Sequence, residues 1–440
     1  MSDKKVITRF APSPTGLLHL GAYRTTIFSY LYAKKHGGEF ILRIEDTDPA
    51  RDKKEYEDNI LESLEWLGLR YDKFYRQSEN IERHKFFIDK MIKEGSAYIS
   101  KEEAKDGSGA MRELVRFKNP NTNVTFHDEI KGDVTTNTKD LGDFIIARSP
   151  TEPLHHLAVV VDDFEEGVTH VIRGEDLTSN TPRQVLIQRA IGVPTPVYAH
   201  LPIVLGPDKL KLSKRRGALP IMEYKKLGFL PDGILNGVAF VGWNPGTDKE
   251  IFTHEELVQA FDLDRVQKSP AALNGEKLEW FNKEHMKLLS QHEIEKNILE
   301  WLPENLKNPK LVPIIFERIF KWSDITNMAE SGELDFFITP PAIRKEKLVY
   351  KNVGVGEIKK NIKLASASLE TISENQFTKE KIKDNLMKVA DEAGNRGEVL
   401  HPVRYALSGL DKSPDPFIIS EILGKNETLS RLQKAIALME

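Results

Sequence analysis

The sequence contains no cysteine, and this absence excludes several kinds of site at once. There can be no disulfide, no zinc site built from thiolates and no cysteine nucleophile. Long apolar runs are also missing. No stretch of 18 apolar residues occurs, and the polar residues 1–5 lead straight into a strand-like segment. We therefore expect no membrane span and no signal peptide, which suits a cytoplasmic location.

The composition sets few further limits. Charged residues make up 30% and hydrophobic residues 40% of the 440 residues, which is enough for sizeable buried cores in two to four domains. The formal net charge is −4, so the basic excess usual in DNA-coating proteins is missing. A large RNA-binding protein can still confine its basic residues to one side. Composition therefore leaves nucleic-acid binding open.

Residues 1–84 alternate between strand-like and helix-like segments. Residues 6–10 and 40–44 are short apolar runs typical of buried strands. A breaker-rich turn follows the first run, and a helix should begin near Gly21. A second helix follows Asp48-Pro49. This order predicts a parallel, Rossmann-like sheet, and the predicted fold class is α/β.

Residues 85–150 interrupt this alternation and predict an inserted subdomain. Val124-Thr125-Phe126 and Phe144-Ile145-Ile146-Ala147 have the alternating pattern of antiparallel strands. The sheet domain should resume over residues 151–210. There we expect strands at 158–161, at 168–172 and at 197–205, and a helix at 181–191.

Beyond residue 217 the pattern becomes mostly helical. We assign residues 211–290 to a loop and stem-contact region, and residues 291–440 to an all-helical domain, as the spacing of Ile294, Ile298 and Leu302 indicates. The stretch 344–363 holds seven basic residues and two glutamates. It is either a solvated helix face or a surface that faces RNA.

The first candidate motif is Pro12-Ser13-Pro14-Thr15-Gly16-Leu17-Leu18-His19-Leu20-Gly21, between a predicted strand and a predicted helix. Open α/β sheets bind ligands at this position. Gly21 leaves the helix start without a side chain, so a nucleotide phosphate can approach the backbone N–H groups. His19 can donate a hydrogen bond to that phosphate. Considered alone, such a histidine is more often a helix cap or a packed residue.

The second motif is Lys211-Leu212-Ser213-Lys214-Arg215-Arg216-Gly217, a dense cationic loop after an apolar strand. Mobile lysines can follow the charge of a triphosphate as it moves toward the leaving pyrophosphate. Ser213 can add a hydrogen bond to a phosphate. A basic loop by itself is usually just solvated. The P-loop pattern Gly-x-x-x-x-Gly-Lys does not occur.

The order, context and wide spacing of the two motifs resemble the paired signature of class I aminoacyl-tRNA synthetases. Five further blocks resemble the glutamyl-tRNA synthetase family, at residues 9–16, 43–48, 160–163, 171–176 and 180–184. The resemblance continues more weakly through residues 242–245 and 402–407. The related glutaminyl enzymes have Pro-Glu-Pro-Asn-Gly where this chain has Pro12-Ser13-Pro14-Thr15-Gly16, which favours glutamate.

The resemblance implies a glutamate–tRNA ligase. Such an enzyme uses ATP, with Mg²⁺, to make glutamyl-adenylate and pyrophosphate, and then transfers glutamate to the 3′-terminal adenosine of tRNA(Glu), with tRNA(Gln) left open. The resemblance implies catalytic roles for six residues: His19, Gly21, Lys211, Ser213, Lys214 and Arg215. We expect ATP to contact Thr15, Gly16, His19, Gly21, Asp176, Val204 and Lys214. Residues 85–150 would contact the acceptor stem, and residues 291–440 the anticodon arm.

Glutamate carries two carboxylates and one ammonium, so its pocket needs two cations and an anion. Arg9 and Arg173 end two predicted strands, and Glu45 ends a third. The alternative for either arginine alone is a surface salt bridge. The resemblance gives amino-acid-binding roles to these three residues and to Ser13, and we add Ala11.

His155 stands where relatives usually have a tyrosine, with His156 beside it. An imidazole can donate a neutral hydrogen bond to the substrate or carry a charge. We predict that His155 lies in the glutamate pocket. The alternative is that both histidines pack against the insertion and touch no substrate.

The inserted segment departs from the family pattern. Many relatives have a longer insertion with a cysteine-rich zinc site, so we expect no protein zinc site here and leave the acceptor-stem contacts open. We expect a monomer. Two other functions are alternatives to the ligase. A truncated paralogue that glutamylates a base in tRNA would lack the helical domain, and a non-catalytic tRNA-binding protein would not need the intact motifs.

Overall fold

The computed structural model describes residues 5–103, 111–206, 208–210, 212 and 219–440. The chain divides into two compact units, Met1–Met286 and Lys287–Glu440, and each is described by itself. Most of the cationic loop, namely Lys211, Ser213, Lys214, Arg215, Arg216 and Gly217, lies outside the described residues.

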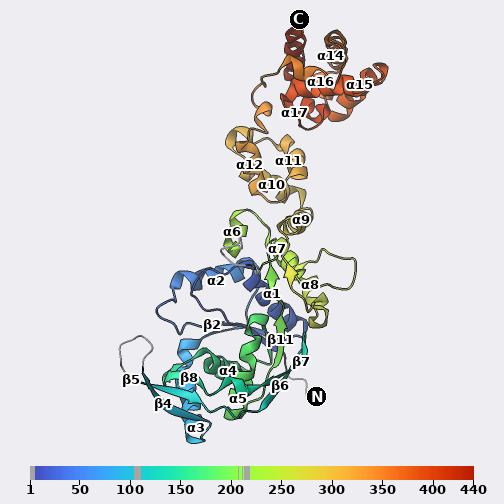
Figure 1. Ribbon diagram of the computed structural model, residues 1–440. Coiled ribbons are helices and arrows are strands. Elements are labelled where there is room, and N and C mark those ends of the chain that lie inside the picture. The colour runs from blue at the N-terminus through green and yellow to red at the C-terminus, as the bar shows by residue number, and fades with distance from the viewer. Residues whose placement is uncertain (1–4, 104–110, 207, 211, 213–218) are drawn as a thin grey trace. The chain divides into compact units, whose positions relative to one another are not determined.

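The first unit begins with the predicted parallel sheet. It has the strand order β1 (Ile7–Phe10), β2 (Glu39–Ile44) and β3 (Lys73–Arg76), all parallel. Helix α1 (Leu20–Lys35) packs against β1 and β2, and α2 (Lys54–Trp66) follows β2 (Figure 1). Tyr23, Ile27 and Leu31 on α1 are fully buried, as their helical spacing predicts.

A second sheet joins the parallel strands to the inserted segment. Its order is β10 (His170–Gly174), β11 (Val197–Leu201), β6 (Asn123–Asp128) and β7 (Gly132–Asn137). Strands β10 and β11 are parallel, whereas β6 and β7 form an antiparallel hairpin. The hairpin reaches the parallel strands through the pair Tyr198 and Asp128. The insertion therefore contributes to the sheet that carries Arg173.

The rest of the insertion is the predicted antiparallel structure. It is a sheet of β4 (Ala97–Glu103), β5 (Met111–Phe117), β8 (Phe144–Ser149) and β9 (Glu152–Pro153). Helix α3 (Ile81–Lys93) precedes it, and α5 (Thr181–Ile191) lies where a helix is predicted. Together they enclose a second hydrophobic core, separate from the core around α1.

The prediction of a strand at residues 158–161 is wrong, because these residues lie in helix α4 (His155–Glu165). A short apolar run does not distinguish a buried strand from a buried helix. Helix α4 contacts α3, α5 and β8, so most of its surface is buried and carries apolar residues. The sequence therefore lacks the single apolar stripe that marks a helix with one side exposed to solvent.

The predicted strand at residues 197–205 is broken at Pro202, which has no N–H for a strand ladder. Its second part, β12 (Val204–Leu205), pairs with β13 (Ala271–Ala272) instead. The first unit ends with helices α6 (Ile221–Lys226), α7 (Pro231–Ala239), α8 (His254–Ala260) and α9 (Gly275–Met286).

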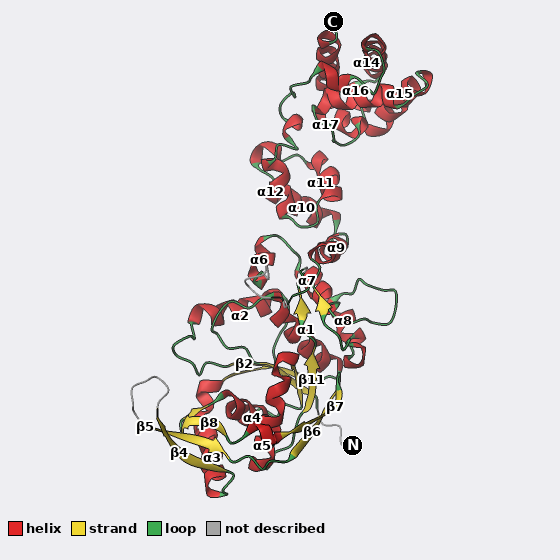
Figure 2. Cartoon of the chain, in the orientation of Figure 1, coloured by secondary structure: helices red, strands yellow, loops and turns green. Residues whose placement is uncertain are grey.

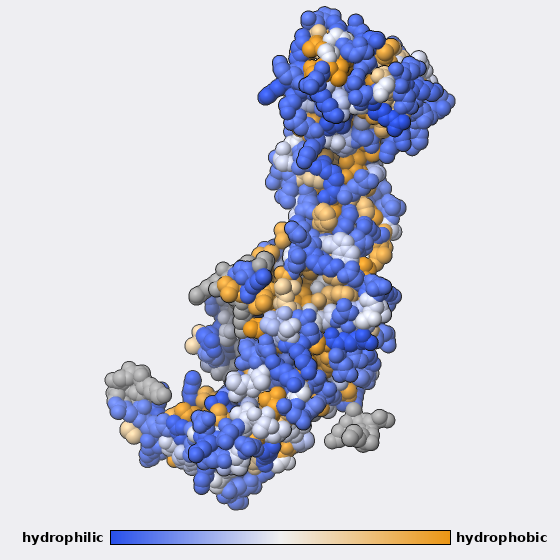
Figure 3. Space-filling model, turned by 45° about the vertical axis from the view of Figure 1, so that its right-hand side comes forward, coloured by the Kyte–Doolittle hydropathy of each residue, from blue (hydrophilic) through white to orange (hydrophobic). Residues whose placement is uncertain are grey.

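Lys287–Glu440 contains helices and loops and, among its residues, which are all described, no strand (Figure 2). Its helices are α10 (Gln291–Trp301), α11 (Val312–Arg318), α12 (Ser323–Glu330), α13 (Lys345–Leu348), α14 (Val355–Glu370), α15 (Lys379–Glu392), α16 (Gly397–Ser408) and α17 (Pro416–Leu438). The predicted all-helical pattern is confirmed. Hydrophilic residues cover most of the face shown in Figure 3. In the described part of the chain, no helix is long and apolar enough to cross a membrane.

Candidate functional site

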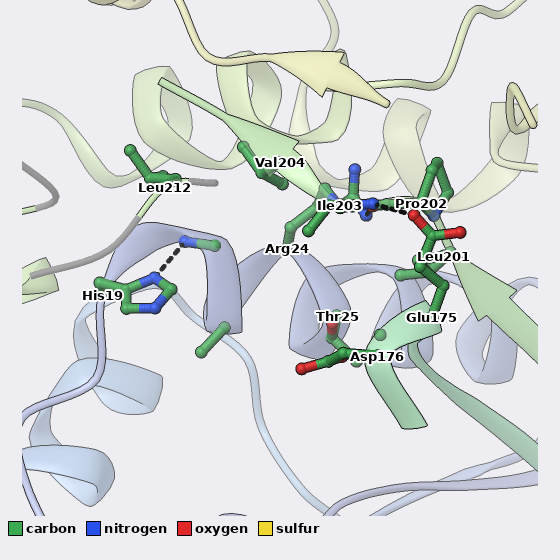
Figure 4. Close-up of a pocket in the computed structure, with 13 residues that line it drawn as sticks. His19, Arg24, Thr25, Glu175, Asp176, Leu201, Pro202, Ile203, Val204 and Leu212 are labelled. Carbon is green, nitrogen blue, oxygen red and sulfur yellow. Dashed lines mark hydrogen bonds between the residues drawn. The ribbon is translucent and has the colours of Figure 1, made fainter. Parts of the chain in front are cut away.

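His19 caps the first helix. Its Nδ1 accepts a hydrogen bond from the backbone N–H of Gly21, 3.1 Å away (Figure 4). This bond places the proton of a neutral ring on Nε2, which is the donor that phosphate binding requires. A Cβ on Gly21 would lie 3.0 Å from the His19 ring. The capping role and the predicted phosphate-binding role are therefore compatible in one residue.

A cavity of about 250 Å³ opens beside this cap. Four of the residues expected to contact ATP line it, namely His19, Gly21, Asp176 and Val204. Leu212 lines it as well, so the described part of the second motif reaches the same cavity. Thr15 and Gly16 are not among the lining residues and belong to the loop before α1.

Arg24 also lines the cavity, and sequence reasoning missed it. Its guanidinium is almost fully buried and donates a hydrogen bond to the backbone carbonyl of Pro202 (Figure 4). It also donates to the backbone carbonyl of Val241. From the other side, a carboxylate oxygen of Glu175 accepts the backbone N–H of Ile203 at 2.8 Å. Arg24 and Glu175 therefore fix the segment between β11 and β12 that forms one wall of the cavity.

Arg173 lies at the end of β10 and is 5% exposed. Its Nε donates to Nε2 of His200 at 3.0 Å, and its Nη2 donates to the hydroxyl of Thr181 at 2.7 Å. The guanidinium also lies 5.2 Å from the ring centre of Tyr198. Among the described residues, no hydrogen-bond acceptor is found for Nη1. Burial lowers the pKa of Arg173 to about 10, so the group remains charged at neutral pH.

Arg9 and Glu45 meet at a buried ionic cluster around Arg43, which is fully buried. Arg9 pairs with Asp163 at 3.1 Å, and Arg43 pairs with the same carboxylate at 2.9 Å. Burial alone would raise the pKa of Asp163, but Arg9 and Arg43 outweigh it and hold this pKa below its ordinary value. Arg43 also lies 3.4 Å from an oxygen of Glu45. The cluster therefore fixes one cation and one anion of the predicted pocket.

The three predicted charges come together at the carboxyl ends of their strands. Strand β1, which carries Arg9, contacts strand β10, which carries Arg173. Burial is the main cause of the lowered pKa of Arg173, and the positive charge of Arg9 adds to it. The backbone N–H of Glu45 donates to the carbonyl of Pro12, which ties β2 to the loop that carries Ser13. Ala11 is partly buried in that loop and Ser13 is exposed.

His155 begins helix α4, and its Nδ1 lies 3.5 Å from the second carboxylate oxygen of Glu45. Its side chain is 47% exposed. His156 points into a more buried environment, where burial, His155, Arg183 and Arg173 lower its pKa to about 4. The ring of His156 is therefore neutral near pH 7. The structure brings His155, not His156, against the predicted ammonium-binding carboxylate.

Sequence reasoning did not identify the supporting residues Arg43, Asp163, His200 and Thr181. A signal for some of them was present, since Arg43 interrupts the apolar strand 40–44 and Asp162-Asp163 end an apolar run. Charged residues inside apolar segments are buried only when they are paired. In the described part of the chain, no group of three or more His, Asp or Glu side chains is arranged to hold a metal ion.

The sequence matches two known families. The family described as "tRNA synthetases class I (E and Q), catalytic domain" matches residues 5–113 and 99–280, and "Anticodon binding domain" matches residues 276–436. The glutamate–tRNA ligase of Thermodesulfovibrio yellowstonii is 37% identical over 98% of this chain and 99% of its own length. This chain belongs to the glutamate–tRNA ligase family of class I tRNA synthetases. The predicted family is confirmed.

Further relatives agree with this assignment. The glutamate–tRNA ligase of Aquifex aeolicus is 48% identical over 63% of this chain and 66% of its own length. A crystal structure of a glutamate tRNA ligase from Elizabethkingia meningosepticum in complex with its amino acid has a TM-score of 0.87 and 30% identity, and covers 99% of this chain and all of the other. The predicted fold class of this ligase is confirmed.

Proposed function

We propose that this ligase activates L-glutamate with ATP and transfers the glutamyl group to the terminal adenosine of tRNA(Glu). The observation that carries the proposal is the adjacency of two sites in one member of this family, because Gly174, which follows Arg173 on β10, lines the cavity. One is the cavity at His19 and Gly21, and the other is the buried charge set of Arg9, Glu45 and Arg173.

ATP would bind at the cavity, with its phosphates at the start of α1. There the backbone N–H groups and Nε2 of His19 donate to phosphate oxygens. Asp176 and Val204 would contact the nucleoside, and Thr15 and Gly16 the phosphates from the preceding loop. Lys211, Ser213, Lys214 and Arg215 would follow the pyrophosphate as it leaves. Mg²⁺ would accompany ATP and offset part of its charge.

Glutamate would bind with its side-chain carboxylate on Nη1 of Arg173 and its ammonium on Glu45. Arg9 would hold a second carboxylate, and Ser13 and Ala11 would complete the pocket from the loop before α1. Binding in this orientation holds the α-carboxylate near the α-phosphate of ATP, and positioning of this kind lowers the barrier without a protein nucleophile.

Residues 85–150 would contact the acceptor stem and the helices of the second unit the anticodon arm. Three further properties belong to the proposal: the enzyme works as a monomer, resides in the cytoplasm and holds no zinc. Of the basic residues in stretch 344–363, Lys347, Lys359 and Lys360 pair with Asp411, Glu440 and Glu357. The unit therefore neutralises part of that stretch itself, and the remaining basic residues form either a solvated helix face or a surface that faces RNA.

The test is pyrophosphate exchange into ATP, measured with glutamate in the presence and absence of purified tRNA(Glu), followed by charging of tRNA(Glu) and tRNA(Gln). We expect glutamate-dependent exchange and charging of tRNA(Glu). Binding of tRNA without exchange under any condition would instead favour the non-catalytic tRNA-binding function. Charging of both tRNAs would show that the enzyme does not discriminate between them.

A further inference from the structure

Arg173 is supported from behind by a line of buried polar groups that begins in the inserted segment. Asp128 ends strand β6 at the turn of the β6–β7 hairpin, and His200 lies on β11. Nδ1 of His200 lies 2.5 Å from Oδ2 of Asp128, and its Nε2 lies 3.0 Å from Nε of Arg173. His200 and Asp128 are fully buried. The line therefore runs from the insertion to the predicted glutamate pocket without exposure to solvent.

The protons along this line follow from its hydrogen bonds. The Nε–H of Arg173 can only donate, so Nε2 of His200 accepts and carries no proton. The proton of a neutral ring is then on Nδ1, which donates to Asp128. Burial lowers the pKa of His200, which keeps the ring neutral. Burial alone would raise the pKa of Asp128, but the hydrogen bond from His200 and backbone N–H bonds outweigh it and hold this pKa below its ordinary value.

Asp128 is itself rigidly held. Its Oδ1 accepts the backbone N–H groups of Ile130 and Lys131 at 3.0 and 2.9 Å, and its Oδ2 accepts the backbone N–H of His200 at 3.0 Å. The hairpin turn thus fixes the carboxylate, the carboxylate fixes the tautomer of His200, and His200 fixes the plane of the Arg173 guanidinium. Nη2 of Arg173 donates to the hydroxyl of Thr181. Nη1 is therefore the guanidinium nitrogen that remains for the side-chain carboxylate of glutamate.

We propose that Asp128 and His200 are positioning residues that orient Arg173 for the side-chain carboxylate of glutamate, so that the inserted hairpin helps to select the amino acid. The proposal rests on the proposed function of Arg173. An arginine recognises a carboxylate through the fixed fork of its N–H groups, so a rotated plane weakens binding even when the charge remains. The selectivity would then depend on a residue that itself makes no contact with the substrate.

Nε2 of His200 also lies 3.1 Å from the hydroxyl of Thr181. Two amide variants of His200 separate its hydrogen bond to Asp128 from its contacts with Arg173 and Thr181. His200→Gln places an amide oxygen near the position of Nε2 and can still accept from Arg173. His200→Asn places an amide N–H near the position of Nδ1 and can still donate to Asp128, but offers nothing to Arg173. We expect His200→Asn to raise KM for glutamate roughly 10-fold or more, the effect of one lost hydrogen bond to a charged group. We expect His200→Gln to restore most of this loss.

Asp128→Asn tests the tautomer. The asparagine amide cannot accept from Nδ1–H in the orientation that keeps its turn hydrogen bonds, so His200 would move its proton to Nε2 and point it at the Nε–H of Arg173. We expect KM for glutamate to rise again. In the His200→Gln background the same substitution should raise KM for glutamate much less, because glutamine has no tautomer to set and only the bond from the backbone N–H of residue 200 is lost.

The assay is pyrophosphate exchange with tRNA(Glu) present, and it records KM for glutamate, KM for ATP and the preference for glutamate over glutamine. A structural loss alone lowers the active fraction and leaves KM unchanged, whereas misorientation of Arg173 raises KM for glutamate and leaves KM for ATP unchanged. The control is His285→Gln, a buried histidine whose ring bonds Asn236 at 3.0 Å, outside the cavity and the charge set.

The outcomes separate the proposal from its premise. If Arg173→Gln loses selectivity while the His200 and Asp128 variants keep the wild-type KM for glutamate, the positioning role is wrong and the proposed function stands. If Arg173→Gln keeps full selectivity in an active enzyme, the role of Arg173 is wrong, and the positioning role is rejected with it. Equal effects of His200→Asn and His200→Gln would also overturn the positioning role.

Discussion

Arg173 is the charge that a buried glutamate side chain would meet, and its loss defines the first test. Arg173→Gln removes the cation but keeps a hydrogen-bonding side chain. We expect kcat/KM for glutamate to fall by a factor that corresponds to several kcal/mol of lost binding energy, because a buried carboxylate loses its charged partner. The neutral side chain of glutamine should be affected much less. Measurement of kcat/KM for both amino acids decides this, and an equal fall for both would contradict a role in selection.

His155 offers a second residue-scale test, because it lies beside Glu45 at the predicted ammonium site. If the protonated imidazole of His155 helps to bind glutamate, KM for glutamate should rise with pH across the range in which the enzyme is active, because a neutral ring carries no charge to attract a carboxylate. His155→Tyr should flatten this rise and keep activity.

The comparison is between KM for glutamate in the two proteins across that pH range. Superimposable pH curves for wild type and His155→Tyr would remove His155 from the pocket. In that case, the alternative that the histidines touch no substrate would hold.

The sequence singles out the charges of the predicted glutamate pocket more readily than the residues that hold them in place. Arg9, Glu45 and Arg173 stand out because each ends an apolar strand in a parallel arrangement. His200 and Asp128 do not, since their meeting depends on β6 pairing with β11 across 72 residues of chain. No local periodicity encodes such a pairing. The resemblance to a known family supplied the roles that spacing could not.

At the scale of elements, α4 shows why apolar runs mislead. The valines at 159–161 favour a strand by composition, yet the helix is buried on several sides and its acidic residues meet Arg43. The same burial places Glu166, just after α4, against Arg43 at 2.7 Å. Burial raises the pKa of Glu166 to about 7, with Asp163 and Asp162 adding to the rise and Arg43 opposing it.

This raised pKa gives stability a definite pH dependence. Between an unfolded value near 4.5 and the folded value of about 7, the folded state binds more protons, so stability falls as pH rises through that window. Glu166→Gln removes the titration. We expect the free energy of unfolding of the variant, relative to wild type, to increase between pH 5 and 8 by roughly 1–3 kcal/mol. Urea unfolding at several pH values measures it, and a pH-independent difference would contradict the assignment.

Arg24 provides the second test at this scale, because it joins α1 to the β11–β12 segment and to the end of α7. Arg24→Met keeps an unbranched, flexible side chain but is shorter and leaves two buried carbonyls without their donor. We expect KM for ATP to rise roughly 10-fold, the effect of lost hydrogen bonds to a charged group, and KM for glutamate to change little. A parallel rise in both KM values would indicate general loosening of the domain instead.

For the whole molecule, the division at residue 287 predicts separable functions. A protein that ends at Met286 keeps the described cavity and charge set and loses the unit that matches an anticodon binding domain. We expect it to bind ATP with unchanged affinity and tRNA much more weakly. Equilibrium binding of both ligands to the shortened and full-length proteins measures this. Equal tRNA affinities would refute the assignment of Lys287–Glu440 to the anticodon arm.

The division into a sheet-bearing part and a helical part was readable from the sequence, because periodicity changes along the chain and helices replace strands. The attachment of the insertion was not. Its strands were predicted, but the entry of the β6–β7 hairpin into the parallel sheet depends on a single residue pair between segments distant in sequence. The conformation of the cationic loop lies outside the described residues, so its predicted role stays a prediction.

The line from Asp128 through His200 to Arg173 also has a consequence for biosynthesis. The parts of the glutamate pocket and its support are spread along the chain from Arg9 to His200, and β11 is the strand that joins them. A nascent chain emerges from its N-terminus. A chain whose residues up to 201 have not yet all left the ribosome therefore contains Arg9 and Glu45. It lacks strand β11, whose His200 orients the guanidinium of Arg173 in the predicted glutamate pocket. If the proposed pocket binds glutamate, the ligand can stabilise the growing polypeptide against unfolding only after β11 has emerged and paired with β10.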